Sequence, residues 1–198
     1  MYKICRTEQS SKRQRAIENT LLSLMHEKKY EDISIIELCA ACDVPRKAFY
    51  RYFDNKDGAL EALIDHTLTD YEEYIAKHKI KRSTRRLSDE LEYFFIFWSK
   101  QKRFLEAIDK NNLIYILVSS SMKYPVNDVI STRRFLPDDS EWMRGQIFNF
   151  TICGLIFLML DWFRRGFSES AHEMAKTACR ILSQPIFPDL ESIGILAE

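Results

Sequence analysis

The chain has 198 residues, of which 46% are apolar and 29% are charged, so it can bury a full core as one large domain or as a small domain joined to a larger one. Its 29 basic and 29 acidic residues give a formal net charge of zero, which excludes a uniformly cationic surface, so any affinity for DNA must come from a local patch. Five glycines and five prolines leave few positions for hairpin turns, and this favours an all-α fold.

Residues 1–9 show no hydrophobic periodicity and are expected to form a flexible arm. Ser10 or Ser11 is placed to cap a helix whose apolar residues, such as Ile17 and Leu21, keep to one face. Three cations gather near the start of this helix: Lys12, Arg13 and Arg15. The helix dipole disfavours cations in a first turn by roughly a few tenths of a kcal/mol each. These three cations form either a solvated face or an arm that meets the phosphates of DNA.

Residues 33–57 have the pattern of two short helices that meet at a tight turn. Ile35 and Leu38 follow the spacing of one buried helix face, and Phe49 and Phe53 let a second helix pack across the first. The side chains left outside are cationic or phenolic: Arg46, Lys47, Tyr50, Arg51, Tyr52 and Lys56. A short exposed helix with cations and hydroxyls beside a helical turn is typical of a helix-turn-helix that binds DNA.

A long connecting helix is predicted over residues 58–78, followed by a basic linker at 79–87 that marks a boundary within the chain. Further helices are indicated at about 88–100, 103–111, 113–133, 139–165 and 168–183, which together form a body over 88–184, and the last residues, 185–198, form a tail. Pro125 should kink or break the third of these helices near Tyr124, because proline removes a helix hydrogen bond at a cost of about 3 kcal/mol.

The segment from Ser34 to Asp57, SIIELCAACDVPRKAFYRYFDNKD, closely resembles the TetR/AcrR family of transcriptional regulators, and its F-Y-x-Y-F-x-x-K motif is specific. The match extends from about residue 12 to residue 68. Residues 154–175 are also similar to one subgroup, the dihydroxyacetone-kinase regulator. The resemblance implies an all-α chain with a three-helix DNA-binding head at 10–57, a connecting fourth helix, and a helical body for ligand binding and dimerisation.

The resemblance also implies roles for single residues in the head. Ser34 would meet a phosphate at the start of the second helix, and Lys56 would clamp the DNA backbone. The third helix would point Arg46, Lys47 and Ala48 at base edges, and Tyr50 and Tyr52 would bond phosphates. The expected DNA-binding set is Ser34, Ile36, Arg46, Lys47, Ala48, Tyr50, Tyr52 and Lys56, together with Lys12, Arg13 and Arg15.

Three residues of this head depart from the family pattern. Asp43 stands where glycine is common in the turn, and aspartate tolerates the left-handed conformation better than most residues do. Pro45 stands where a capping serine is usual, so a cap hydrogen bond is lost. Ile36 can reach only a thymine methyl group or the sugar-phosphate surface, so base recognition should rest more on the third helix.

The spacing of the polar residues in the sequence matches no catalytic or metal-binding motif. Cys39 and Cys42 form a C-x-x-C, but zinc needs four ligands, and we interpret both as small packed residues, with redox sensing as the alternative. The histidines each stand alone in the sequence: His26, His66, His78 and His172. We therefore expect neither an enzyme nor a cofactor or metal.

Composition also bears on the compartment. Five scattered cysteines, an odd number, do not form the framework of a small secreted domain, so we expect reduced thiols in a cytoplasmic protein. The N-terminus has no apolar stretch typical of a signal peptide. The most apolar run, residues 147–160, is too short to cross a bilayer of about 30 Å, so it predicts a buried helix and no membrane partner.

Residues 93–98, YFFIFW, are apolar nearly all round, which predicts burial on more than one side. They form either a solid core or one wall of a ligand pocket. The expected pocket residues are Phe94, Phe97, Trp98, Tyr115, Trp142 and Phe148. Few ionisable groups lie in these runs, which favours an apolar or aromatic ligand.

Residues 139–165 and 168–183 are apolar on two helix faces, so we expect them to pair with the same helices of a second subunit in a homodimer with twofold symmetry. Two heads on such a dimer would select palindromic double-stranded DNA. These expectations together describe a repressor that a small-molecule effector releases from its operator. The alternative is a regulator that works through a protein partner, or an activator, without a small-molecule inducer.

Overall fold

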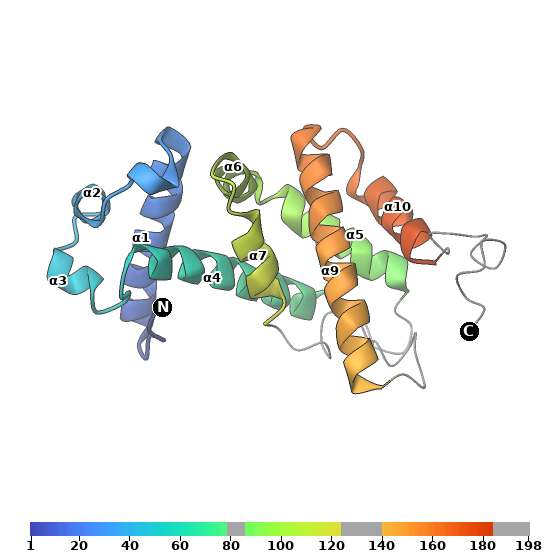
Figure 1. The fold of residues 1–198 in the computed structure, drawn as a ribbon, viewed down its shortest axis with the longest axis horizontal. Coiled ribbons are helices and arrows are strands. Elements are labelled where there is room, and N and C mark those ends of the chain that lie inside the picture. Colours follow the sequence, from blue (N-terminus) through green and yellow to red (C-terminus); the bar gives the residue numbers. More distant parts are fainter. Residues whose placement is uncertain (79–85, 124–139, 184–198) are drawn as a thin grey trace, which may run out of the picture.

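The computed structural model describes residues 1–78, 86–123 and 140–183, and within these ranges every regular element is helical apart from one isolated bridge between Tyr2 and Phe53. The all-α expectation is confirmed. Most of the predicted basic linker, the residues around Pro125 and the predicted tail lie outside the described residues. Figure 1 shows two groups of helices, a small one at one end and a larger one at the other, joined by the long helix α4.

The small group is a head built on a helix that starts earlier than predicted. Its elements are α1 (Glu8–Glu27), the 3-10 turn η1 (Tyr30–Asp32), α2 (Ile35–Ala41) and α3 (Arg46–Phe49). Thr7, and not Ser10 or Ser11, caps α1, because its side chain accepts a hydrogen bond from the Ser10 N–H in a capping box. Lys12 and the two arginines that follow therefore lie beyond the first turn, where the dipole no longer penalises them.

The first residues of the chain are not the free arm that their composition predicts. The N–H of Lys3 donates to the Tyr52 carbonyl at 2.9 Å, and the N–H of Asp54 donates to the Met1 carbonyl at 3.2 Å. These bonds hold the segment along the end of the head. Gly58 makes room for it, because a Cβ there would lie 2.2 Å from the Met1 carbonyl oxygen. The correction has a physical reason: backbone hydrogen bonds need no hydrophobic periodicity.

Helix α4 (Lys56–Lys77) starts at Asn55, whose side chain caps it by accepting from the Gly58 N–H, and runs from the head into the body. The body contains α5 (Leu87–Ser99), α6 (Lys102–Lys110), α7 (Ile114–Ser121), α9 (Glu141–Arg164) and α10 (Ala171–Ser183). Helix α7 ends at Ser121, earlier than the predicted end near residue 133 and ahead of Pro125. The apolar run of α5 is buried, with Phe95 fully enclosed against Trp162 of α9.

Helix α9 is 24 residues long, so the apolar run 147–160 is only its central part. Among the described residues it is the one helix long and apolar enough to cross a membrane, and 39% of its most apolar window is buried inside the structure. Length alone therefore does not exclude a membrane span, contrary to the expectation from the run itself. One face of α9 packs on the other helices of the body, and Phe150 and Phe157 are exposed on another.

The turn between α2 and α3 is a Schellman motif, a helix end closed by two backbone hydrogen bonds. The N–H of Val44 donates to the Cys39 carbonyl at 2.9 Å, and the N–H of Asp43 donates to the Ala40 carbonyl at 3.3 Å. Asp43 has a φ of 51°, the left-handed conformation predicted for it. This residue therefore sets the angle at which α3 leaves α2.

Replacing Asp43 by glycine should stabilise the protein, because glycine adopts a positive φ without steric cost. We expect Asp43→Gly to raise the free energy of unfolding by about 0.5 kcal/mol in urea denaturation. The matched control is Ala40→Gly in the exposed part of α2, which should lower it by about 1 kcal/mol. A loss of similar size at both positions would contradict the assigned backbone conformation.

Candidate nucleic-acid interface and ligand pocket

Helices α2 and α3 lie at the end of the molecule farthest from the body (Figure 1). Ser34 caps α2 by accepting a hydrogen bond from the Glu37 N–H at 3.1 Å, and this leaves it exposed at the start of the helix. Pro45 precedes α3 and provides no side-chain cap, as predicted. Phe49 and Leu38 are fully buried beneath the two helices, so the packing that orients them is apolar.

The outer side of this head carries the residues that were expected to read DNA. Arg46 and Lys47 are exposed on α3, and Ala48 is half-buried between them and the core. Ile36 is 62% exposed on α2. Cations and an apolar side chain on one protruding pair of helices can provide hydrogen bonds to base edges and a contact for a thymine methyl group.

The two tyrosines are placed differently from each other. Tyr50 is 41% exposed and rests edge-on against Phe49, with ring centroids 5.5 Å apart. Tyr52 is half-buried and packs beside Phe53. The Lys3 ammonium donates to the Tyr50 carbonyl at 3.0 Å and so brings one more exposed cation to this end of the head. No sequence signal marked Lys3, because only the folded N-terminal segment brings it there.

Lys56, one of the expected DNA-binding residues, makes its described contacts within the protein. Its ammonium donates to the carbonyls of Tyr30 at 2.6 Å and Glu31 at 3.2 Å and lies 4.3 Å from the centre of the Tyr30 ring. Partial burial lowers its pKa, although the nearby carboxylates of Asp57 and Asp32 act in the opposite direction. The side chain therefore ties α4 to η1 within the protein, and its expected contact with a DNA phosphate stays a prediction.

The cations of α1 are also used differently from the expectation. Arg15 makes two hydrogen bonds to Asp70 of α4, at 2.8 and 3.1 Å, and so braces α1 against the connecting helix. Lys12 pairs with Glu8 at 2.7 Å on the helix surface, a contact worth little in water. Arg13 is exposed. Of the three cations, Arg15 is the one whose described contact joins two helices of the protein.

Cys39 and Cys42 behave as packed residues. Cys39 is 4% exposed, and the Cys42 thiol donates to the Leu38 carbonyl at 3.0 Å. Burial raises the pKa of both thiols, so little reactive thiolate is present at neutral pH. In the part of the chain that the structure describes, all five cysteines are free and no group of residues could hold a metal ion.

The histidines are not isolated, which corrects the sequence-based interpretation. His66 of α4 faces Glu18 of α1 at 2.9 Å, and this carboxylate is almost fully buried. His172 of α10 similarly meets Glu92 of α5 at 3.0 Å. Both pairs join helices that are distant in sequence, so these histidines serve packing contacts between elements.

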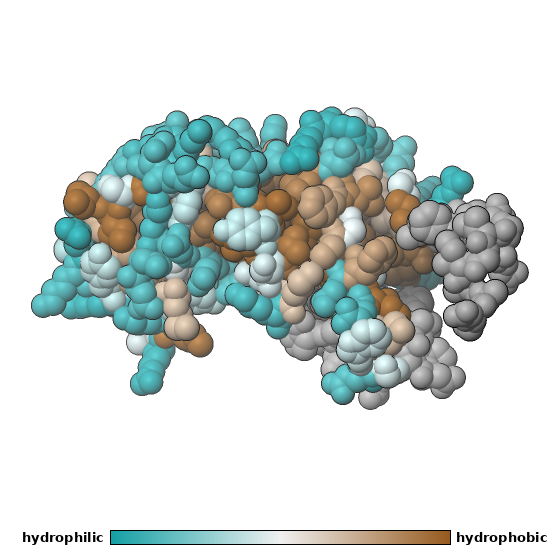
Figure 2. All heavy atoms as spheres, viewed as in Figure 1, coloured by the Kyte–Doolittle hydropathy of each residue, from teal (hydrophilic) through white to brown (hydrophobic). Residues whose placement is uncertain are grey.

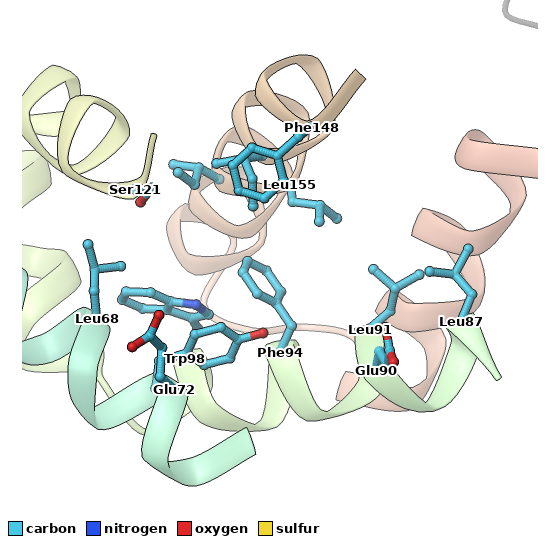
Figure 3. A pocket seen from close by; sticks show the side chains of 13 residues that line it. Leu68, Glu72, Leu87, Glu90, Leu91, Phe94, Trp98, Ser121, Phe148 and Leu155 are labelled. Carbon is cyan, nitrogen blue, oxygen red and sulfur yellow. The ribbon is translucent and has the colours of Figure 1, made fainter. Parts of the chain in front are cut away.

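An apolar pocket lies in the body between α4, α5, α7 and α9 (Figure 3). Its cavity volume is about 50 Å³, within an opening of about 670 Å³ that includes space open to solvent. Its lining includes Leu68 of α4, Phe94 and Trp98 of α5, Ser121 of α7, and Phe148 and Leu155 of α9. A mostly apolar concave site with few polar groups is typical of small-molecule binding.

Three of the six expected pocket residues line this pocket: Phe94, Trp98 and Phe148. Phe97 is buried but packs on Tyr71 and Tyr74 of α4, at centroid distances of 5.2 and 5.5 Å. Tyr115 and Trp142 are 64% and 68% exposed on other faces of their helices, which corrects their assignment. Aromatic character alone does not show which face of a helix turns inward.

Comparison with known proteins now adds to this geometry. Residues 19–63 match the bacterial regulatory proteins of the tetR family. No curated protein matches the chain. Three solved structures share its fold, and each is under 20% identical to the chain. One is the "Dihydroxyacetone kinase operon activator DhaS", at 18% identity and a TM-score of 0.55, over 86% of this chain and 93% of that chain.

The other two structures are similar over nearly the same length. A TetR transcriptional regulator from Streptococcus agalactiae 2603V is 16% identical with a TM-score of 0.61, over 89% of this chain and 96% of that chain. The fatty acid degradation regulator FadR from Bacillus halodurans is 11% identical with a TM-score of 0.61, over 88% of this chain and 96% of that chain. At these identities the likeness shows a common fold, from the head to the end of the body.

The position of Lys56 leads to a test that separates a structural cation from a DNA-binding one. Lys56→Ala should lower the free energy of unfolding by about 1.5 kcal/mol, because it removes charged hydrogen bonds to two carbonyls. Lys47→Ala removes an exposed cation and should change stability by less than about 0.5 kcal/mol. Chemical denaturation measures both variants. Unchanged stability in Lys56→Ala, with weakened DNA binding, would restore the original assignment.

Proposed function

We propose that this chain, which belongs to the tetR family and is a DNA-binding transcriptional regulator, acts as a homodimeric cytoplasmic repressor that a small apolar or aromatic ligand releases from its operator. One observation carries the proposal: α4 begins at the head and its later turns line the pocket. A change in the pocket wall is therefore a change in the element that positions the head.

The proposed contacts with DNA follow from exposure on the head. Arg46 and Lys47 reach base edges in the major groove, and Ile36 meets a thymine methyl group or the sugar surface. The phosphate contacts come from Ser34 at the start of α2 and from the hydroxyl of Tyr50, an exposed residue. Tyr52, Ala48 and the cations Lys12 and Arg13 stay in the proposed set as secondary contacts, and Lys56 and Arg15 leave it.

The proposed dimer forms through the outer face of α9. Met143, Phe150 and Phe157 follow each other at intervals of seven residues and are exposed to 39%, 68% and 56%. Figure 2 shows apolar side chains gathered over α7 and α9 on the viewed face. Fully burying a phenylalanine side chain contributes about 1.5 to 3 kcal/mol, so two copies gain substantially by covering this row in each other.

Helix α10 contributes less to this interface than expected. Its apolar residues Met174, Ala175 and Ala178 are buried against the body, mainly on α5, whereas its outer side carries Lys176 and other polar groups. Ile181, 51% exposed, is the apolar residue near its end that can extend the α9 face. The proposed contact therefore centres on α9, with the last turns of α10 at its edge.

Release from DNA requires that the ligand prefer one spacing of the two heads over another. The origin of the pocket walls supports this part of the proposal, because they come from α4 as well as from α5, α7 and α9. A ligand between Leu68 of α4 and Leu155 of α9 pushes on a helix that also carries the head. Its differential affinity for the two spacings sets how far DNA binding falls.

A second reading, an activator or a regulator that works through a protein partner, is favoured by one observation. The structure named as an operon activator shares the fold over most of both chains. The two readings differ in what a pocket ligand does. In the repressor a ligand weakens DNA binding, whereas in the partner-dependent regulator DNA binding does not respond to it.

DNA binding should depend on Arg46. We expect Arg46→Ala to weaken binding to a sequence selected from random DNA by about 1 to 3 kcal/mol and to relax the base preference at one position. Lys176→Ala on α10 removes the same charge far from the head and should leave the affinity unchanged. Fluorescence anisotropy at two salt concentrations measures both, since charge contacts weaken as salt rises. Equal effects of the two variants would refute the assigned interface.

The dimer should depend on the exposed row of α9. Phe150→Glu and Phe157→Glu each place a charge in the proposed contact and should convert the dimer to a monomer in sedimentation analysis. Ile4→Glu changes another highly exposed apolar residue, on the N-terminal segment, and should leave the dimer intact. The assignment fails if the unmodified protein is a monomer, or if both α9 variants remain dimers with native helix content.

A further inference from the structure

Trp98 carries a hydrogen-bond donor that has no partner among the described residues. The indole is 2% exposed, and no acceptor in the described part of the chain bonds its Nε1. An indole N–H can only donate, and leaving such a group buried without a partner costs free energy. The other buried indole shows the ordinary arrangement, because Nε1 of Trp162 donates to the Glu169 carbonyl at 3.0 Å. The unused donor of Trp98 therefore requires an explanation.

The position of Trp98 supplies an explanation for this unpaired donor, because the residue lines the pocket of the body. Figure 3 shows its ring beneath Phe148 and Leu155, with the nitrogen at the edge that faces Phe94. The hydroxyl of Ser121, a second polar group in the lining, already donates to the Leu117 carbonyl at 2.8 Å. Trp98 thus brings a donor without a described partner to the wall of an apolar pocket, where one hydrogen bond counts for more than it does in water.

The charges around the pocket narrow the ligand class further. No lysine, arginine or histidine is among the described residues that line it. The ionisable side chains in that lining are Glu72 and Glu90, both carboxylates, and Tyr71. A carboxylate or phosphate group on the ligand would lose its hydration and find no described cation to replace it. An anionic ligand is therefore disfavoured.

We infer that the pocket binds a neutral, mainly aromatic molecule whose one acceptor oxygen takes the Nε1–H of Trp98. The class includes aryl ketones, aldehydes, esters and amides, with the ring held against Phe94 and Phe148. The inference deepens the proposed function, since it rests on the same pocket acting as the effector site. The acceptor distinguishes the right ligand from a plain hydrocarbon of equal size, because the hydrocarbon leaves the donor unpaired.

Three probes of similar size separate the possibilities: acetophenone, which has a carbonyl acceptor, ethylbenzene, which has none, and benzoate, which is an anion. NMR titration of the ligand signals with the unmodified full chain gives the three dissociation constants. We expect acetophenone to bind about fivefold more tightly than ethylbenzene, the difference that one neutral hydrogen bond supplies, and benzoate to bind most weakly. The indole N–H proton of Trp98 should shift with acetophenone and not with ethylbenzene.

Trp98→Phe removes the donor and keeps an aromatic ring, so acetophenone and ethylbenzene should bind this variant equally. Trp162→Phe is the matched control: it makes the same substitution at a buried indole that already has a partner, and the preference for acetophenone should persist. The chain has three tryptophans, so the two variants also assign the indole proton signals. Thermal unfolding of each variant confirms that it is folded before titration.

The inference is overturned by equal binding of acetophenone and ethylbenzene to the unmodified protein, by a preference that survives Trp98→Phe, by benzoate binding most tightly, or by binding of none of the three. The titrations contain no DNA, so these outcomes are independent of whether the head binds an operator. Conversely, a protein that binds acetophenone as expected but no DNA would retain the ligand class and refute the proposed regulator.

Discussion

The fold depends on the packing of one helix, α4, against the head at its start and against the body beyond. Near the head, Ala59, Ala62 and Ile64 are fully buried, and small residues there let α1 approach closely. The pair between Glu18 and His66 and the paired bonds between Arg15 and Asp70 then fix α4 to α1 along its middle. Because α4 is one continuous helix, no loop separates its contacts with the head from its contacts with the body.

A second connection prevents the head from swinging freely about α4. Asn111, at the end of α6, accepts a hydrogen bond from the Tyr30 N–H at 2.6 Å and donates to the Met25 carbonyl at 3.4 Å. Lys110 also donates to the His26 carbonyl at 2.6 Å. Tyr30 in turn donates its hydroxyl to Asp57 in the first turn of α4, at 2.6 Å, and burial with this carboxylate raises the Tyr30 pKa. The body therefore holds the head through both α4 and α6.

The parts of this architecture that are local in sequence could be predicted from it. The turn at Asp43 and the caps at Ser34 and Asn55 need only neighbouring residues, and the pattern of apolar side chains around Phe49 marks the helix-turn-helix. Features set by distant segments could not be predicted. Lys56 turns inward because the 3-10 turn presents two carbonyls to it, and no spacing in the sequence encodes that meeting.

The pocket also has some features that the sequence predicts and others that it does not. Within residues 93–98, Phe94, Phe95, Phe97 and Trp98 are buried, as expected for an element that is apolar on nearly all sides, and Tyr93 and Ile96 are half-buried. The rotation of α5, α7 and α9 relative to one another decides which aromatic rings face the cavity. The helix propensity of single residues does not determine this rotation. Tyr115 and Trp142 are therefore at the surface, whereas the aliphatic residues Ile152 and Leu155 line the space.

The central claim is that filling the pocket changes the head through α4. The most direct test measures the affinity of the dimer for its selected operator with and without acetophenone at a concentration that saturates the pocket, with occupancy followed by NMR in the same samples. The account predicts at least a fivefold loss of DNA affinity on saturation, which corresponds to a coupling free energy of about 1 kcal/mol. An unchanged affinity while the pocket is occupied would contradict it.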